Sequence, residues 1–147
     1  MRRWPQQPRW LRVAVVVLVL LLFYGTAVHV AQLLTARGQP YPALPAWLRL
    51  YFVSLTLLDP LAAVLLLRRH RVGVLLTVGV LVTDAAANTL ANYAFDDATG
   101  VTAGRFGQAV ITLLAVGCLM ITPALWRATA SPRPRISQTP SPRTRRT

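Results

Sequence analysis

The sequence predicts an all-α membrane protein, an antiparallel up-down bundle of four transmembrane helices. Of the 147 residues, 54% are hydrophobic, and they gather in long runs. Each run has about the twenty residues that cross a bilayer core roughly 30 Å thick. The segments between the runs are short, so consecutive helices should alternate in direction. The four runs are residues 13–36, 47–67, 72–95 and 106–126.

The first run, residues 13–36, follows a basic amino-terminal segment, residues 1–12, whose two tryptophans suit a membrane interface. The run is longer than the roughly 7–15 apolar residues of a secretory signal, and residues 28–31 make a poor cleavage site. We therefore expect a retained membrane helix. Prolines in residues 37–46 remove backbone donors and favour extended backbone, which should end this helix.

The second run, residues 47–67, is joined to the third, residues 72–95, by a basic turn of four residues. So short a connection makes these two helices neighbours in the bundle. A polar loop with two glycines precedes the fourth run, residues 106–126. Residues 127–147 are rich in Pro, Ser, Thr and Arg, and we expect them to be disordered because they have almost nothing apolar to bury.

The arginines predict the orientation. All 16 basic residues are arginine, and only three, Arg37, Arg49 and Arg105, flank the runs on one side. The other 13 lie on the side of both termini and the short turn: Arg2, Arg3, Arg9, Arg12, Arg68, Arg69, Arg71, Arg127, Arg133, Arg135, Arg143, Arg145 and Arg146. Because basic residues concentrate in cytoplasmic flanks, we expect both termini in the cytoplasm and a location in the cell membrane.

The same arginines indicate partners. They flank apolar runs, so we expect them to meet anionic lipid and not nucleic acid. A membrane-protein partner or a homo-oligomer also fits this fold class.

Polar side chains also occur inside the apolar runs, where they are costly and usually face the bundle interior. At 1.5 Å per residue from the cytoplasmic ends of their runs, Asp59 and Asp84 lie about 12 and 18 Å deep. Because the second and third helices are neighbours, both carboxyl groups should lie close in height near mid-membrane. Most of the other polar residues fall in the outer half of the bilayer.

These polar residues share helix faces. On the third helix, Asp84, Asn88 and Asn92 are spaced four apart and form one stripe. On the first and fourth helices, the polar residues are spaced three or four apart. The candidate ligand-binding residues are Asp84, Asp59, Thr56, Asn88, Asn92, His29, Gln32, Gln108 and Thr112.

Two interpretations of these residues compete. Either they hydrogen-bond across helices and fix the packing, at about 0.6–2 kcal/mol each, or they line a pocket open to the outside. Asp59 also has a local explanation, because Pro60 frees the Thr56 carbonyl, which a protonated carboxyl group could meet. Asp84 has no such explanation and is the best single candidate for a functional residue.

We predict no metal site, no cofactor and no catalytic residue. Cys118 is the only cysteine, so neither a disulfide within the chain nor a cysteine metal site can form. The sequence has no phosphate loop, no zinc spacing and no nucleophile elbow. Asp96 and Asp97 are too few ligands for a calcium site.

In composition and layout the whole chain resembles small integral membrane proteins of high-GC bacteria, a resemblance that implies no particular activity or site. We expect a non-enzymatic integral membrane protein, structural or accessory, with an outward-facing polar pocket. The alternative is a small transporter or binder of a small or lipidic molecule that uses Asp84. A third is an intramembrane enzyme with an aspartate and His29 as acid–base groups.

Overall fold

The computed structural model describes residues 7–36, 41 and 43–130. These residues form four helices and no strand: α1 (Arg9–Thr35), α2 (Ala46–Leu67), α3 (Arg71–Ala94) and α4 (Ala103–Thr129). The shortest has 22 residues, which at 1.5 Å each make about 33 Å. All four helices are long and apolar enough to cross a membrane, which confirms the four predicted helices.

The first helix begins earlier than the apolar run. α1 begins at Arg9 instead of at residue 13, because the Pro8 carbonyl accepts the backbone N–H groups of Leu11 and Arg12. Hydropathy marks only the apolar part of a helix, whereas backbone hydrogen bonds extend to its cap. The last part of the basic segment is therefore helical, and residues 1–6 lie outside the described residues.

The fourth helix is longer than its run at both ends. It begins at Ala103, where the Thr102 hydroxyl accepts the Arg105 backbone N–H at 3.1 Å, and it ends at Thr129. Residues 127–129, which we expected in a disordered tail, are therefore helical. Residues 131–147 lie outside the described residues.

The turn between α2 and α3 is tight. Arg69 has a φ of 58°, and the backbone N–H groups of Arg69 and His70 bond to the carbonyls of Leu66 and Leu65 at 2.9 and 3.0 Å. A Cβ added to Gly73 would lie 2.5 Å from the backbone nitrogen of Leu66. Only glycine permits so close an approach, and α2 and α3 are neighbours, as the short turn predicts.

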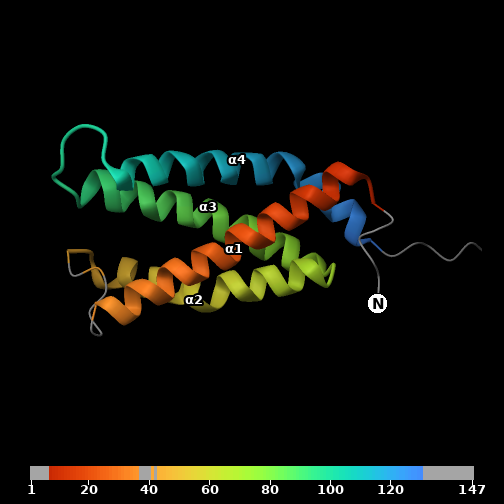
Figure 1. Cartoon of the computed structure of the whole chain (residues 1–147), viewed down its shortest axis with the longest axis horizontal. Coiled ribbons are helices and arrows are strands. Elements are labelled where there is room, and N and C mark those ends of the chain that lie inside the picture. Colours follow the sequence, from red (N-terminus) through yellow and green to blue (C-terminus); the bar gives the residue numbers. More distant parts are fainter. Residues whose placement is uncertain (1–6, 37–40, 42, 131–147) are drawn as a thin grey trace, which may run out of the picture.

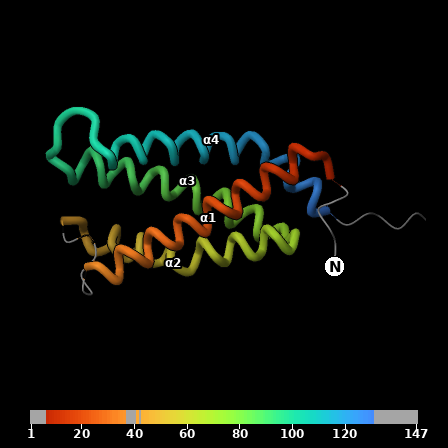
Figure 2. The backbone as a smooth tube through the Cα atoms, viewed as in Figure 1, coloured from red at the N-terminus to blue at the C-terminus, as the bar shows by residue number. Residues whose placement is uncertain are grey.

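The helices pack in chain order, α1 on α2, α2 on α3 and α3 on α4, whereas α1 and α4 touch only over a short stretch. The α1–α2 and α3–α4 connections lie at one end of the molecule, called the loop end below (Figure 1). The turn formed by residues 68–70 lies at the opposite end, the turn end. Figures 1 and 2 show α1 and α4 diverging toward the loop end.

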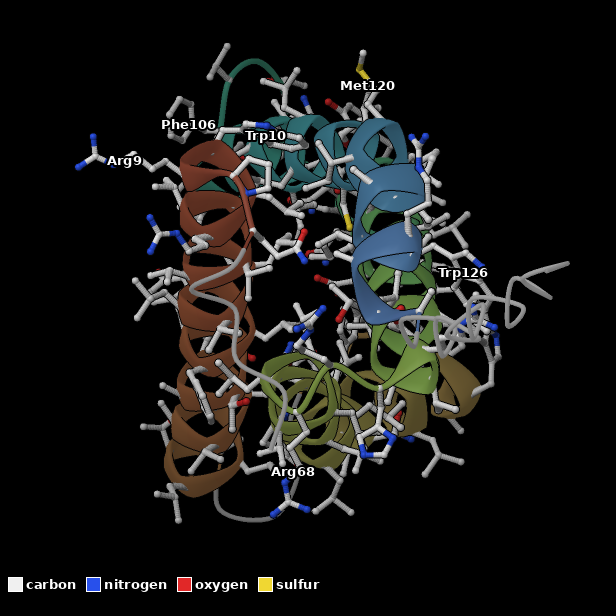
Figure 3. All side chains as sticks on the ribbon, turned by 90° about the vertical axis from the view of Figure 1, so that its right-hand side faces the viewer. Arg9, Trp10, Arg68, Phe106, Met120 and Trp126 are labelled. Carbon is white, nitrogen blue, oxygen red and sulfur yellow. The ribbon has the colours of Figure 1, made fainter. Side chains whose placement is uncertain are left out.

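Apolar side chains fill the contacts between successive helices and also cover the outside. On the outer faces, Leu57 is 75% exposed, Leu113 72% and Met120 78%, and Met120 projects away from the other helices (Figure 3). Exposed apolar faces of this extent are unfavourable in water and suit lipid. The largest fully buried apolar side chains are Leu22, Leu48, Leu55, Leu66 and Leu125.

Candidate functional site

A cavity of about 500 Å³ lies in the half of the bundle next to the loop end, where α1 and α4 diverge (Figure 1). All four helices and the α1–α2 connection contribute to its lining. Its volume falls in the range of roughly 300–1,000 Å³ that is usual for pockets that hold small molecules. Five of the nine candidate residues line it: His29, Gln32, Asp59, Asp84 and Asn88.

Asp59 of α2 is 4% exposed and lies against α1. A Cβ added to Gly25 would lie 2.6 Å from Oδ2 of Asp59, so the missing side chain at Gly25 makes room for the carboxyl group. Asp59 forms no hydrogen bond with any residue that the structure describes. The local bond from Asp59 to the Thr56 carbonyl is therefore not formed. Both oxygens of Asp59 remain available to a molecule in the cavity.

Asp84 of α3 is 7% exposed and also lines the cavity. Nδ2 of Asn88, one turn further on, donates to Oδ1 of Asp84 at 2.9 Å and to the Asp84 carbonyl at 3.0 Å. The carboxyl groups of Asp84 and Asp59 are close enough to interact electrostatically. Two acids from neighbouring helices thus meet in one cavity, as their depths along the helices predict.

On its α1 side the cavity is lined by His29 and Gln32. Tyr41, from the α1–α2 connection, lines the cavity beside them. The Tyr41 hydroxyl donates to Oε1 of Gln32, and Nδ1 of His29 lies 3.2 Å from the same hydroxyl oxygen. Burial raises the pKa of Tyr41 to about 12, so the phenol keeps its proton at neutral pH. Because that proton goes to Gln32, Nδ1 of His29 is placed to donate to the Tyr41 hydroxyl oxygen, and in this tautomer Nε2 is an acceptor.

Tyr41 has an uncommon backbone conformation. Its φ of 56° lies in the left-handed region, which bulky residues rarely adopt and which is frequent at binding sites. Its ring packs on Phe52 of α2 with 5.0 Å between the centroids, and His29 stacks on the same Phe52 at 6.0 Å. Tyr41 and Phe52 thus give the cavity aromatic surface beside its polar groups.

Two further candidates, Gln108 and Thr112 of α4, lie outside the cavity lining; Gln108 bonds to α3, and Thr112 bonds to Gln108. Nε2 of Gln108 on α4 lies 3.1 Å from the Ala85 carbonyl, 2.5 Å from the Thr89 hydroxyl and 2.9 Å from the Thr112 hydroxyl. Oε1 of Gln108 is buried without a partner. These four residues, Ala85, Thr89, Gln108 and Thr112, are called the polar ladder below. Their bonds fit the packing interpretation.

Asn92 and Thr56 also lie outside the lining. Nδ2 of Asn92 donates to the Asn88 carbonyl at 2.9 Å, and its Oδ1 occupies the space beside Gly104 of α4. The Thr56 hydroxyl donates to the Val53 carbonyl of its own helix at 2.7 Å. The predicted stripe on α3 is therefore divided, because Asp84 and Asn88 face the cavity and Asn92 faces α4.

The α4 side of the cavity is apolar. A Cβ added to Gly107 would meet no atom within 4 Å, so the space beside the α4 backbone is open there. The cavity thus has one polar side, built from two carboxyl groups, two amides, an imidazole and the Tyr41 hydroxyl, and one apolar side. The apolar side includes Gly107, Val110, Ile111 and Leu114.

The lining is acidic although the chain is strongly basic. The sequence has 16 arginines, four aspartates and a net charge of +12. Two of the four aspartates line the cavity, and no arginine is among the described residues that line it. Within the described part of the chain, no three or more His, Cys, Asp or Glu residues are grouped so that they could hold a metal ion.

Comparison of the chain with models of protein families, with curated proteins and with solved structures finds no match. Fold and cavity together define a class: a small four-helix protein of membrane-spanning dimensions with an acidic cavity between its first and last helices. Its role has to be inferred from its own residues.

Gly25, Tyr41 and Phe52 were not among the candidates. Gly25 lies four residues before His29 and seven before Gln32, so helical periodicity alone could have placed it on the cavity face. Thr26, three residues before His29, has the same spacing but is not in the lining, and its hydroxyl donates to the Leu22 carbonyl of its own helix at 2.9 Å. For Tyr41 and Phe52 the sequence contains no comparable signal, because their positions depend on the path of the connection between α1 and α2.

Proposed function

We propose that this chain is a multi-pass protein of the cell membrane, an antiparallel bundle with both termini in the cytoplasm. The length and apolar outer faces of the helices support a membrane location. Figure 3 looks onto the turn end, where α1 begins with Arg9 and Trp10, α2 is followed by Arg68, and α4 ends just after Trp126. Arginine in excess at one end is typical of the cytoplasmic side, and tryptophan suits either interface; the cavity would then lie in the outer half of the bilayer.

The proposed function is the binding of a small amphiphilic molecule in this cavity. The supporting observation is a space of about 500 Å³ with carboxyl and amide groups on one side and aliphatic groups on the other. Because α1 and α4 diverge beside it, a molecule dissolved in the outer leaflet could enter from the side. Such a protein could serve as a binder or as the binding unit of a transporter.

Binding fits the contacts better than catalysis does. Asp84 bonds to Asn88, and His29 bonds to Tyr41 and Gln32; within the described part of the chain, no hydrogen bond joins His29 to Asp84. An acid–base pair needs its two groups within reach of the same proton. A purely structural or accessory role is the second candidate, and the polar ladder between α3 and α4 favours it.

The test is to identify the molecules that remain on the purified protein. The parent and two variants are purified in a mild detergent, and co-purified small molecules are identified by mass spectrometry. In Gly107→Leu the new side chain enters the cavity, where a Cβ meets no atom. Gly117→Leu is the matched control, because Gly117 is on the same helix, also has open space around it and does not line the cavity.

We expect a small molecule to be recovered with the parent and with Gly117→Leu, and to be lost from Gly107→Leu. Equal recovery from all three proteins would show that the molecule binds elsewhere, as ordinary annular lipid does. If nothing but bulk phospholipid is recovered from any of them, the binding function is contradicted and the structural role is favoured.

A further inference from the structure

We propose that the ligand is an amphiphilic organic cation, with an ammonium group at Asp59 and Asp84 and an apolar body along α4. This inference rests on the proposed binding function and adds the chemical class of the ligand to it. It is derived from the charge of the lining, its hydrogen-bonding groups and the shape of the cavity.

The charge of the lining excludes an anion. Two carboxyl groups face the cavity, and no arginine is among its described lining residues. In a low-dielectric environment, two carboxylates without a counter-charge are strongly disfavoured. Either protons or a bound cation must neutralise them, and an ammonium group would interact with both.

When a bound cation keeps the two carboxyl groups ionised, most of the free hydrogen-bonding groups of the lining are acceptors, and the amide nitrogen of Gln32 is the main donor. Among the described residues, Asp59 has no hydrogen-bond partner, and the Asp84 carboxyl group receives one bond, from Asn88 to its Oδ1. Nδ2 of Asn88 is occupied by its bonds to Asp84, so Oδ1 of Asn88 remains to accept. Nε2 of His29 is an acceptor as well. An ammonium group has only donors, whereas a carboxylate or phosphate has only acceptors and would leave these oxygens unpaired.

The missing side chain at Gly25 also favours an ammonium group at the polar side of the cavity, beside Asp59. Because Gly25 has no side chain, Asp59 reaches the α1 backbone and lies between α1 and α2 at the polar side of the cavity. Aromatic rings of Phe52 and Tyr41 line the cavity beside it. Ring faces attract cations electrostatically, and more strongly where water is excluded. They would strengthen the binding of an organic ammonium.

Size and shape exclude a bare inorganic ion. A cavity of about 500 Å³ is far larger than a dehydrated metal ion needs, and the described residues contain no metal-binding cluster. The apolar side formed by Val110, Ile111 and Leu114 offers no ligand to an ion and suits an aliphatic or aromatic body. The ligand class is therefore an amine with an apolar body of moderate size.

Three probes that differ only in their head group test this inference: 4-phenylbutylamine, 4-phenylbutanol and 4-phenylbutanoate. Binding is measured by calorimetry at neutral pH in nanodiscs of zwitterionic phosphatidylcholine, and the heat with protein-free nanodiscs is subtracted. The proteins are the parent, Asp84→Asn, Gly107→Leu and the charge-matched control Asp97→Asn. Asp97 lies in the exposed loop before α4 and does not line the cavity.

We expect the amine to bind the parent and Asp97→Asn at least about tenfold more tightly than the alcohol, a factor that corresponds to about 1.4 kcal/mol. The carboxylate should not bind. Asp84→Asn should lose the preference for the amine, and Gly107→Leu should bind none of the probes. Asp84→Glu should restore part of the preference, which a loss caused by misfolding of Asp84→Asn would not explain.

The two proposals can fail separately. If amine and alcohol bind the parent equally, and Gly107→Leu removes both, the cation inference is overturned and the binding function stands. If the carboxylate binds best, the cation inference is likewise overturned. If no probe binds the parent, the cation inference is overturned, and the mass spectrometry described above decides the binding function independently.

Discussion

Polar side chains occur both in the polar ladder between α3 and α4 and on the polar side of the cavity between α1 and α4. The two regions differ in how many of these polar groups have hydrogen-bond partners within the protein. In the ladder, the amide nitrogen of Gln108 reaches a carbonyl and two hydroxyl groups. In the cavity, the structure's described residues give Asp59 no hydrogen-bond partner and give the Asp84 carboxyl group Asn88 alone. The difference follows from helix spacing, because α3 and α4 pack together and α1 and α4 diverge.

This contrast teaches that a polar residue in an apolar helix can stabilise packing or form a site, depending on the distance to the next helix. Hydrogen bonds across tightly packed helices satisfy polar groups within the protein. Where the helices separate, the same groups keep unused acceptors for a ligand. Variants of the two regions should therefore affect different properties, stability for the ladder and binding for the cavity.

The largest effect should come from Gly25→Leu. Its Cβ would lie 2.6 Å from Oδ2 of Asp59, so Asp59 must move into the space that the ligand head group would occupy. We expect 4-phenylbutylamine affinity to fall by more than about tenfold and the unfolding free energy by about 1–3 kcal/mol, the usual cost of overpacking. Calorimetry and thermal unfolding in detergent measure the two effects.

Gly79→Leu on α3 is the control for this substitution. Gly79 is exposed and a Cβ there meets no atom within 4 Å, so both properties should stay close to those of the parent. If Gly25→Leu behaves like Gly79→Leu, the contact between Asp59 and α1 has no role in the site.

A smaller effect, confined to stability, is expected for Gln108→Leu. The substitution removes the bonds from Gln108 to Ala85 and Thr89, and with them a link between α3 and α4. We expect the unfolding free energy to fall by about 1 kcal/mol, the scale of one hydrogen bond between membrane helices. Amine affinity should not change, and a loss of affinity equal to that in Asp84→Asn would erase the distinction between the two regions.

Tyr41→Phe should have a milder effect on the cavity. It removes the hydroxyl that bonds to Gln32 and lies beside Nδ1 of His29, but keeps the ring packed on Phe52. We expect a loss of about 0.5–1.5 kcal/mol in stability, the usual net value of one hydrogen bond, and amine binding a few times weaker. Unchanged values in both assays would mean that the hydroxyl does not order this side of the cavity.

The smallest effect concerns pH. Burial raises the pKa of Tyr41 from 10.0 to about 12, so the folded protein favours the neutral phenol. The stability that this shift contributes is fully present below pH 10 and is lost as the pH rises through 12. The stability difference between parent and Tyr41→Phe should therefore be constant from neutral pH to about 9 and change only above 10. If the stability difference between parent and Tyr41→Phe changed between pH 7 and 9, the buried position of Tyr41 would be contradicted.

The four helices and the similar heights of the two acids could be predicted because they depend on features that are local in the sequence. Run length and the four-residue turn predict the helices and the adjacency of α2 and α3. The rise per residue then predicts that Asp59 and Asp84 lie at similar heights. Both predictions use only the chain's own geometry along the helix axis.

The division of the nine candidates could not be predicted, because it depends on how far apart the helices lie. Gln108 and His29 are both buried polar residues near the loop end, and nothing in their sequence neighbourhood indicates that Gln108 bonds to groups of α3 whereas His29 lines the cavity. The role of Tyr41 depends on a connection that folds back onto the cavity. The helix ends were also missed, because Pro8 and Thr102 set them and hydropathy does not detect caps.

The central claim, that the two acids form a cation site and the ladder does not, is tested most directly by one ratio. It is the affinity for 4-phenylbutylamine divided by that for 4-phenylbutanol, measured in nanodiscs for Gln108→Leu and for the double variant Asp59→Asn/Asp84→Asn. We predict a ratio of about ten or more for Gln108→Leu, as for the parent, and about one for the double variant, with alcohol binding retained. A double variant that keeps the ratio of the parent would contradict the account.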